Sequence, residues 1–138
     1  MKNFILVSVL ALVGCATPQV YNPTNTPNQE LSNVRTSGGE QLFLTEKYSA
    51  FILYIYDENK NEITKRNALS NQINDISLPA GEYRFQVSCQ NKWYEGTPLA
   101  FFKLEPSKQY EIYCDITKGS NFLGMSVDSK VQLKIKEI

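Results

Sequence analysis

Residues 82–89 (EYRFQVSC) decide the fold class, because their polarity alternates without interruption. The odd-numbered residues of this stretch are aromatic, aliphatic or cysteine, and the even-numbered ones are charged or polar. Successive side chains of a β-strand point to opposite faces, so this pattern predicts a strand with one buried face. The preceding Leu78-Pro79-Ala80-Gly81 predicts a β-turn, since Pro79 presets φ and Gly81 accepts a positive φ.

Similar runs lie on both sides of this strand. Residues 49–56 (SAFILYIY) predict a central strand with Phe51, Leu53 and Ile55 on one face and Ile52, Tyr54 and Tyr56 on the other. Further strands are expected at 99–104, 110–116 and 127–138. The last of these also has helical spacing at 127, 131 and 135, but its β-branched residues and strict alternation favour a strand.

About seven or eight short strands separated by turns predict an all-β domain, an antiparallel β-sandwich that spans residues 31–138. The chain of 138 residues is long enough for one domain. It has 14 Lys+Arg against 14 Asp+Glu and no basic block, which gives no electrostatic reason to expect nucleic acid. It has no histidine, and this excludes Ser-His-Asp and Cys-His nucleophiles and histidine metal sites.

The N-terminus has the pattern of an export signal. One positive charge at Lys2 precedes an apolar run at 4–13 (FILVSVLALV), which is too short to span roughly 30 Å of hydrocarbon. The residues that follow, Leu12-Val13-Gly14-Cys15, resemble the lipobox of bacterial lipoproteins. The alternative is an ordinary secretory peptide that contains a cysteine.

The lipobox resemblance implies that residues 1–14 are removed and that Cys15 is acylated and becomes the first residue of the mature chain. Several acyl chains give stable membrane attachment, whereas one gives only marginal binding. Ala16 stands where an aspartate would resemble an inner-membrane retention signal, which favours the outer membrane, facing the periplasm or the cell surface. Residues 15–30, rich in Pro, Asn and Thr, predict a semi-extended tether of up to about 45 Å.

The other two cysteines, Cys89 and Cys114, each end an apolar face of an expected strand, so both should face the core. In an oxidising compartment this orientation favours a disulfide, although two free buried thiols are the alternative. A bridge would leave no thiolate nucleophile.

The remaining candidates for function are two loops. The only tryptophan, Trp93, stands beside Tyr94 in a polar stretch, where it would serve as an interface anchor or as a lid over the sandwich. Phe122 and Leu123 lie at a glycine-flanked tip that would cap the core or contact a partner or lipid.

The sequence gives little support for a catalytic site made of carboxylates alone. Asp57, Glu58, Glu95 and Glu105 show no spacing that singles out a catalytic pair. Residues 57–61 match alternate positions of a calcium loop but lack its glycine, which favours a solvated hairpin turn. We therefore expect no catalytic residue, no metal site and no cofactor.

Residues 76–87 (ISLPAGEYRFQV) and two parts of 96–112 (GTPL and LEPSKQYEI) resemble the "GTPL … LxPGxYxV" pattern of PEGA-type and transthyretin-like modules in bacterial envelope lipoproteins. Ser107 departs from it, standing where glycine is usual. The resemblance implies an immunoglobulin- or transthyretin-like sandwich outside the cytoplasm and carries no catalytic residue. The expected function is a non-enzymatic envelope lipoprotein that binds or scaffolds another envelope protein. The alternative is an inhibitor or a ligand- or glycan-binding lipoprotein that uses the Trp93-Tyr94 loop.

Overall fold

The computed structural model describes residues 19–37, 48–64, 73–91, 95–120, 123–124 and 126–138. These residues form nine strands and one 3₁₀ turn without an α-helix, which confirms the predicted all-β class. No helix in this part of the chain has the length and apolar character needed to cross a membrane. The elements are β1 (Gln19–Val20), η1 (Asn28–Glu30), β2 (Ser32–Thr36), β3 (Ser49–Tyr56), β4 (Asp75–Leu78), β5 (Gly81–Gln90), β6 (Glu95–Gly96), β7 (Leu99–Leu104), β8 (Gln109–Ser120) and β9 (Ser126–Glu137).

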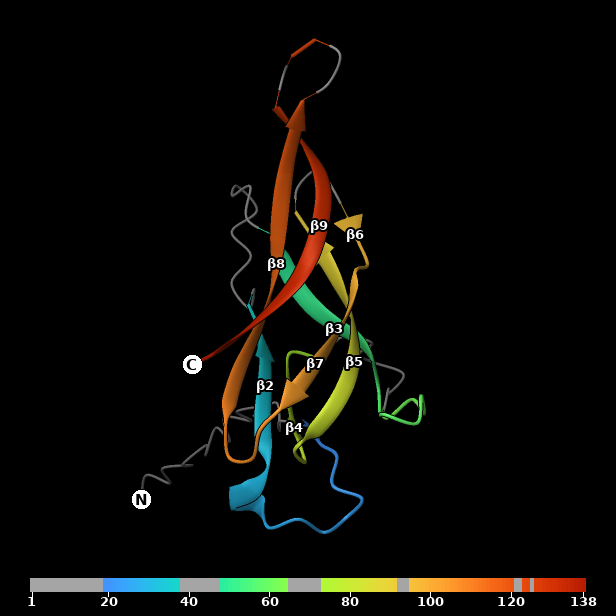
Figure 1. The fold of residues 1–138 in the computed structure, drawn as a ribbon, viewed down its shortest axis with the longest axis vertical. Helices are drawn as coiled ribbons and strands as arrows, with labels where there is room; N and C mark the ends of the chain where they lie inside the picture. Colours follow the sequence, from blue (N-terminus) through green and yellow to red (C-terminus); the bar gives the residue numbers. More distant parts are fainter. Residues whose placement is uncertain (1–18, 38–47, 65–72, 92–94, 121–122, 125) are drawn as a thin grey trace, which may run out of the picture.

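The strands form two sheets (Figure 1). The larger sheet has the order β1-β4-β2-β8-β9. The smaller, four-stranded sheet is built around β5, which pairs with β3 on one side and with β6 and β7 on the other. The two residues Pro79 and Ala80 connect β4 of the larger sheet to β5 of the smaller one, so the predicted turn is a corner between the sheets.

The expectation of a wholly antiparallel sandwich is wrong for the larger sheet. β1 runs parallel to β4, and β2 runs parallel to β8. Parallel neighbours need a long crossover connection, and the chain between β2 and β8 supplies one because it passes through the smaller sheet on the way.

Apolar side chains from both sheets share one core, which includes the predicted inner face of β5. Phe85 is fully buried at its centre and packs against Phe102 with ring centroids 5.8 Å apart. The expected inner face of β8 is also found, since Tyr110 and Ile112 are buried and Cys114 packs against the core. The larger buried side chains are Val34, Ile52, Ile55, Ile63, Ile73, Ile76, Leu78, Tyr83, Phe85, Val87, Leu104, Tyr110, Ile112 and Leu133.

β3 departs from the predicted alternation. Among the described strands it stands at one edge of the smaller sheet and not at the predicted central position, with isolated bridges to Ile73 and Glu62 on its other side. Its register with β5 shifts between Ile52 and Tyr54. This bulge inserts Leu53 as an extra residue, so that Ile52 and Ile55 both enter the core. The predicted grouping of Leu53 with Ile55 on one face is therefore wrong, and Tyr54 and Tyr56 lie together on the opposite face.

The segment expected as a tether, residues 15–30, joins the larger sheet where it is described. Gln19 and Val20 pair with Ile76 and Ser77 of β4, and the backbone N–H of Tyr21 donates to the Ser77 carbonyl over 3.0 Å. The folded domain thus begins before the expected residue 31.

The β8–β9 hairpin extends well past the rest of its sheet (Figure 1). β8 pairs with β2 only as far as Ile112, whereas its pairing with β9 continues to Ser120. The predicted alternation of β9 is confirmed, because Leu133 is buried between the exposed Lys134 and the half-buried Gln132.

Candidate functional site

Most of the binding residues expected from the sequence lie outside the described residues. This holds for Cys15, Trp93, Tyr94 and Phe122, as it does for the expected signal at 1–14. Leu123 is described: it follows the far end of β8 and is 65% exposed. The described residues therefore do not bring these candidates together.

Cys89 of β5 and Cys114 of β8 form a disulfide between the two sheets, in agreement with the expected pairing. Their Cα atoms lie 6.0 Å apart. Ile112 is the last β8 residue that pairs with β2, and Cys114 lies two positions after it. The bridge therefore holds β8 to the smaller sheet at the level where its neighbour β2 ends. This is a structural role.

The outer face of the smaller sheet carries a different candidate for a binding site. Tyr56 of β3, Arg84 of β5 and Phe101 of β7 are direct neighbours across three strands. The guanidinium carbon of Arg84 lies 5.9 Å from the ring centre of Tyr56 and 5.5 Å from that of Phe101. Both distances are within the range of cation–π attraction, so the charged group is held between two rings.

A second row lies beside the first, where Tyr54, Gln86 and Leu99 are cross-strand neighbours. Tyr54 and Tyr56 are stacked, with ring centroids 6.1 Å apart and an interplanar angle of 16°. Phe101 is 72% exposed, the highest value for a large hydrophobic residue among those described. We name these two rows the aromatic–arginine surface, made of Tyr54, Tyr56, Arg84, Gln86, Leu99 and Phe101.

Arg84 is unusual in its polar contacts. Its Nε atom is buried without a hydrogen-bond partner, which is true of no other buried side-chain nitrogen or oxygen in the described part of the chain. A buried donor without an acceptor costs about 1–3 kcal/mol. The aromatic faces offset part of this cost, but they do not neutralise the positive charge.

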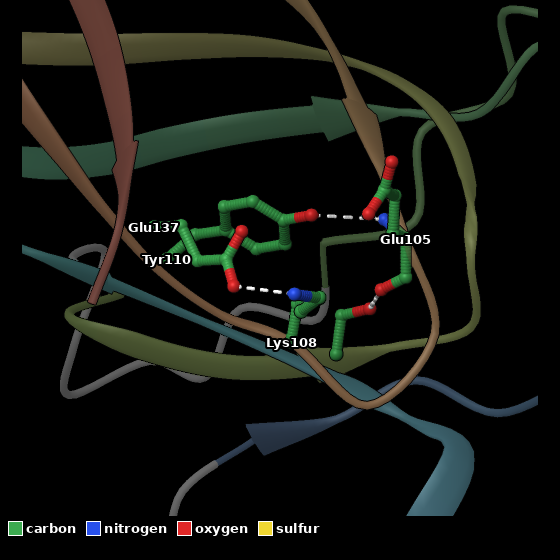
Figure 2. Close-up of polar contacts among 5 residues, drawn as sticks. Glu105, Lys108, Tyr110 and Glu137 are labelled. Carbon is green, nitrogen blue, oxygen red and sulfur yellow. Dashed lines mark hydrogen bonds and ion pairs between the residues drawn. The ribbon is translucent and has the colours of Figure 1, made fainter.

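Polar contacts at the opposite sheet serve the fold. The turn before β8 is fixed by Tyr110, whose hydroxyl accepts the backbone N–H of Glu105 over 3.0 Å, and by an ion pair of Lys108 with Glu137 (Figure 2). Ser107 in this turn has a φ of 62°, in the left-handed region that favours glycine. Its hydroxyl donates to the carbonyl of Gln29 over 2.7 Å, tying the N-terminal segment to the turn.

Among the titratable groups of the described ranges, Asp57 and Tyr83 have pKa values shifted by local structure. Backbone N–H groups, that of Asn61 foremost, lower the pKa of Asp57, as in an ordinary turn. Burial raises the pKa of Tyr83 to about 12, and its hydroxyl donates to the Pro79 carbonyl. No group of three or more Asp, Glu or Cys residues placed to hold a metal occurs in the ranges described.

The aromatic–arginine surface was not among the residues expected to bind from the sequence. The available signal was a strand, residues 99–104, with apolar side chains on both of its faces. A strand covered on one side needs apolar residues only on the covered face. Leu99 and Phe101 are apolar residues on the other face, where burial in the core does not require them.

Comparison of the chain with protein-family models, with curated proteins and with solved structures finds no match.

Proposed function

We propose that this protein is a lipid-anchored protein of the bacterial envelope whose domain binds another envelope protein and catalyses no reaction. The anchor would be the acyl chains on Cys15, in the outer membrane and facing the periplasm or the cell surface. The lipobox-like residues 12–15 support this part of the proposal. The immunoglobulin- or transthyretin-like subtype of the fold is part of the same proposal.

The observation that carries the binding function is the aromatic–arginine surface. Aromatic residues and arginine are the residue types that dominate binding energy in protein interfaces. Phe101 is exposed although its strand already buries Leu104 and packs Phe102 against the core, so folding does not require its side chain. The exposed ring of Phe101 and the half-buried rings of Tyr54 and Tyr56, grouped around a charged side chain, support the proposal of a contact surface for a partner.

Anchoring at Cys15 would keep the domain close to the membrane. Four residue steps separate Cys15 from Gln19, the first residue of β1. Fully extended chain covers at most about 3.6 Å per residue, so about 14 Å separates the lipidated residue from the sheet at most. The partner would therefore be a protein at or near the same membrane surface.

Two experiments test the proposal. Cys15→Ala should abolish incorporation of radiolabelled palmitate and release the protein from the membrane fraction; equal labelling of both forms would refute the anchor.

For binding, a photoreactive amino acid is placed at position 101 of the full-length protein in living cells. We expect a discrete cross-linked species, which is absent when the same group replaces the exposed Lys130 of β9. The same cross-linking at both positions, or at neither, would contradict binding through this surface.

A further inference from the structure

We propose that Arg84 is the specificity-determining residue of the aromatic–arginine surface and binds the side-chain carboxylate of an Asp or Glu in the partner protein. This inference rests on the proposed binding function and names the chemistry of its partner. The acidic residue would lie in a segment that also sets an apolar side chain against Phe101 and Leu99.

The position of the guanidinium is fixed before any ligand arrives. Tyr56 and Phe101 are its cross-strand neighbours on opposite sides, and both rings lie within 6 Å of it. A long side chain held in this way loses little further rotamer freedom on binding, which favours affinity. The planar guanidinium suits a carboxylate, which accepts two parallel hydrogen bonds from it.

The charge of Arg84 has no counter-ion within the described residues, unlike several other cations of the protein. No ion pair of Arg84 is found there. Two acidic residues lie near it on this face: Glu82 is the direct cross-strand neighbour of Lys103, and Glu62, opposite Tyr56, accepts a hydrogen bond from the Thr64 hydroxyl over 3.1 Å. By contrast, four other cations have a carboxylate within 4.0 Å: Arg35 with Glu111, Lys108 with Glu137, Lys134 with Asp115, and Lys136 with Glu111.

The surroundings favour a carboxylate over a phosphate. Arg84 supplies a single positive charge, and its cross-strand neighbours Tyr56 and Phe101 are aromatic. A phosphate group carries up to two negative charges and more acceptor oxygens, for which one partly shielded arginine is a poor match. Leu99 and Phe101 on the same face are exposed apolar contacts, which suit a peptide segment that mixes an acidic with apolar residues.

The test uses protein expressed from the full sequence, labelled with ¹⁵N, and two short peptides. The probe is acetyl-Leu-Glu-Phe-amide and its matched control is acetyl-Leu-Gln-Phe-amide, which differs only in the charge. We expect the Glu peptide to shift the NMR signal of the Arg84 Nε–H group and to bind about tenfold more tightly than the Gln peptide, which corresponds to about 1.4 kcal/mol.

Variants assign this preference to one residue. Arg84→Gln should bring the affinity ratio of the two peptides to about one. Arg84→Lys keeps the charge without the planar pair of donors and should leave an intermediate ratio. Lys103→Gln removes a different cation of the same sheet, and it should change the ratio by less than about twofold.

Several results would overturn the inference: equal binding of the two peptides, no binding of either, or a preference that survives Arg84→Gln. A larger shift with inorganic phosphate or with a neutral chitin disaccharide than with the Glu peptide would also overturn it, because it would assign the site to another ligand. Because the peptide preference is measured without the natural partner, it can hold even if cross-linking in cells finds no partner, so the two proposals fail separately.

Discussion

Cys89 and Cys114 join the two sheets at the level where the pairing of β8 with β2 ends and its pairing with β9 continues. Beyond this point no further strand lies beside β8 in the larger sheet, among the residues that the structure describes. The disulfide therefore stabilises the base of the hairpin as well as closing a loop, and both effects should appear when the bridge is removed.

Loss of the bridge should destabilise the protein strongly. The sequence separation of the two cysteines is 25 residues, and closing a loop of this length contributes about 3.5 kcal/mol in the chain-entropy model. Urea unfolding of the oxidised protein and of the Cys89→Ala/Cys114→Ala variant measures the difference. Cys89 is fully buried, so the double variant also leaves a small cavity. A difference below about 1 kcal/mol would mean that the bridge does not constrain the unfolded chain.

The disulfide could be predicted because alternation places both cysteines on inward faces and the export signal implies an oxidising compartment. Cys89 and Cys114 end two runs of inward-facing residues, and period two fixes which face each side chain takes. The pairing of the strands could not be predicted in the same way. Nothing in the polarity of β2 shows that its neighbours are β4 and the distant β8, because parallel pairing depends on how the chain crosses between sheets.

The same limit explains why the aromatic–arginine surface was missed. The sequence of β3 reads as one continuous alternating run, and only the extra residue at Leu53 places Tyr54 and Tyr56 beside Arg84. A bulge changes the face of every residue after it, and no residue type in this run indicates that a bulge is present. Likewise Gln19 and Val20 are too short a segment to read as a strand, and only contact with β4 makes them one.

The two phenylalanines on opposite faces of the smaller sheet should differ sharply in their effect on stability. Phe85 is fully buried, so Phe85→Ala should cost about 3–5 kcal/mol through lost burial and a cavity. Phe101 is 72% exposed, so Phe101→Ala should change the free energy of unfolding by less than about 1 kcal/mol. Thermal or urea unfolding compares the two variants. A large loss of stability with Phe101→Ala would show that the exposed ring supports the fold and would weaken its assignment to binding.

Replacing Lys60 by glycine should stabilise the turn after β3. Lys60 has a φ of 65°, a conformation that disfavours side chains with a Cβ by about 1–2 kcal/mol. Because glycine also gains freedom in the unfolded chain, we expect a net gain of about 0.5–1 kcal/mol.

Ser107→Gly is the matched comparison for this substitution. Ser107 has a φ of 62° but also donates a hydrogen bond to the Gln29 carbonyl. Losing that bond offsets the gain, so this variant should be close to neutral. Both changes are measured by urea unfolding, and a loss of stability with Lys60→Gly would contradict the role given to backbone conformation.

Tyr83 should make the protein sensitive to alkaline pH. Its hydroxyl donates to the Pro79 carbonyl and its ring is buried, and burial raises the pKa to about 12 from the ordinary value of 10.0. The folded state therefore holds this proton more tightly than the unfolded state. Between these two pKa values the unfolded chain binds fewer protons, so the free energy of unfolding falls as the pH rises through that range. Below pH 10 the contribution of Tyr83 is fully present.

The Tyr83→Phe variant separates this effect from other alkaline effects. It has no ionisable hydroxyl, and its loss of the hydrogen bond to Pro79 should lower stability at neutral pH by about 1 kcal/mol. Between pH 9 and pH 11.5, however, its melting temperature should fall less than that of the unmodified protein. Rapid thermal scans at both pH values measure this, with Tyr113→Phe as the control because Tyr113 is only half-buried and lies outside the core cluster. Equal falls in the Tyr83→Phe variant and the unmodified protein would show that ionisation of Tyr83 is not coupled to unfolding.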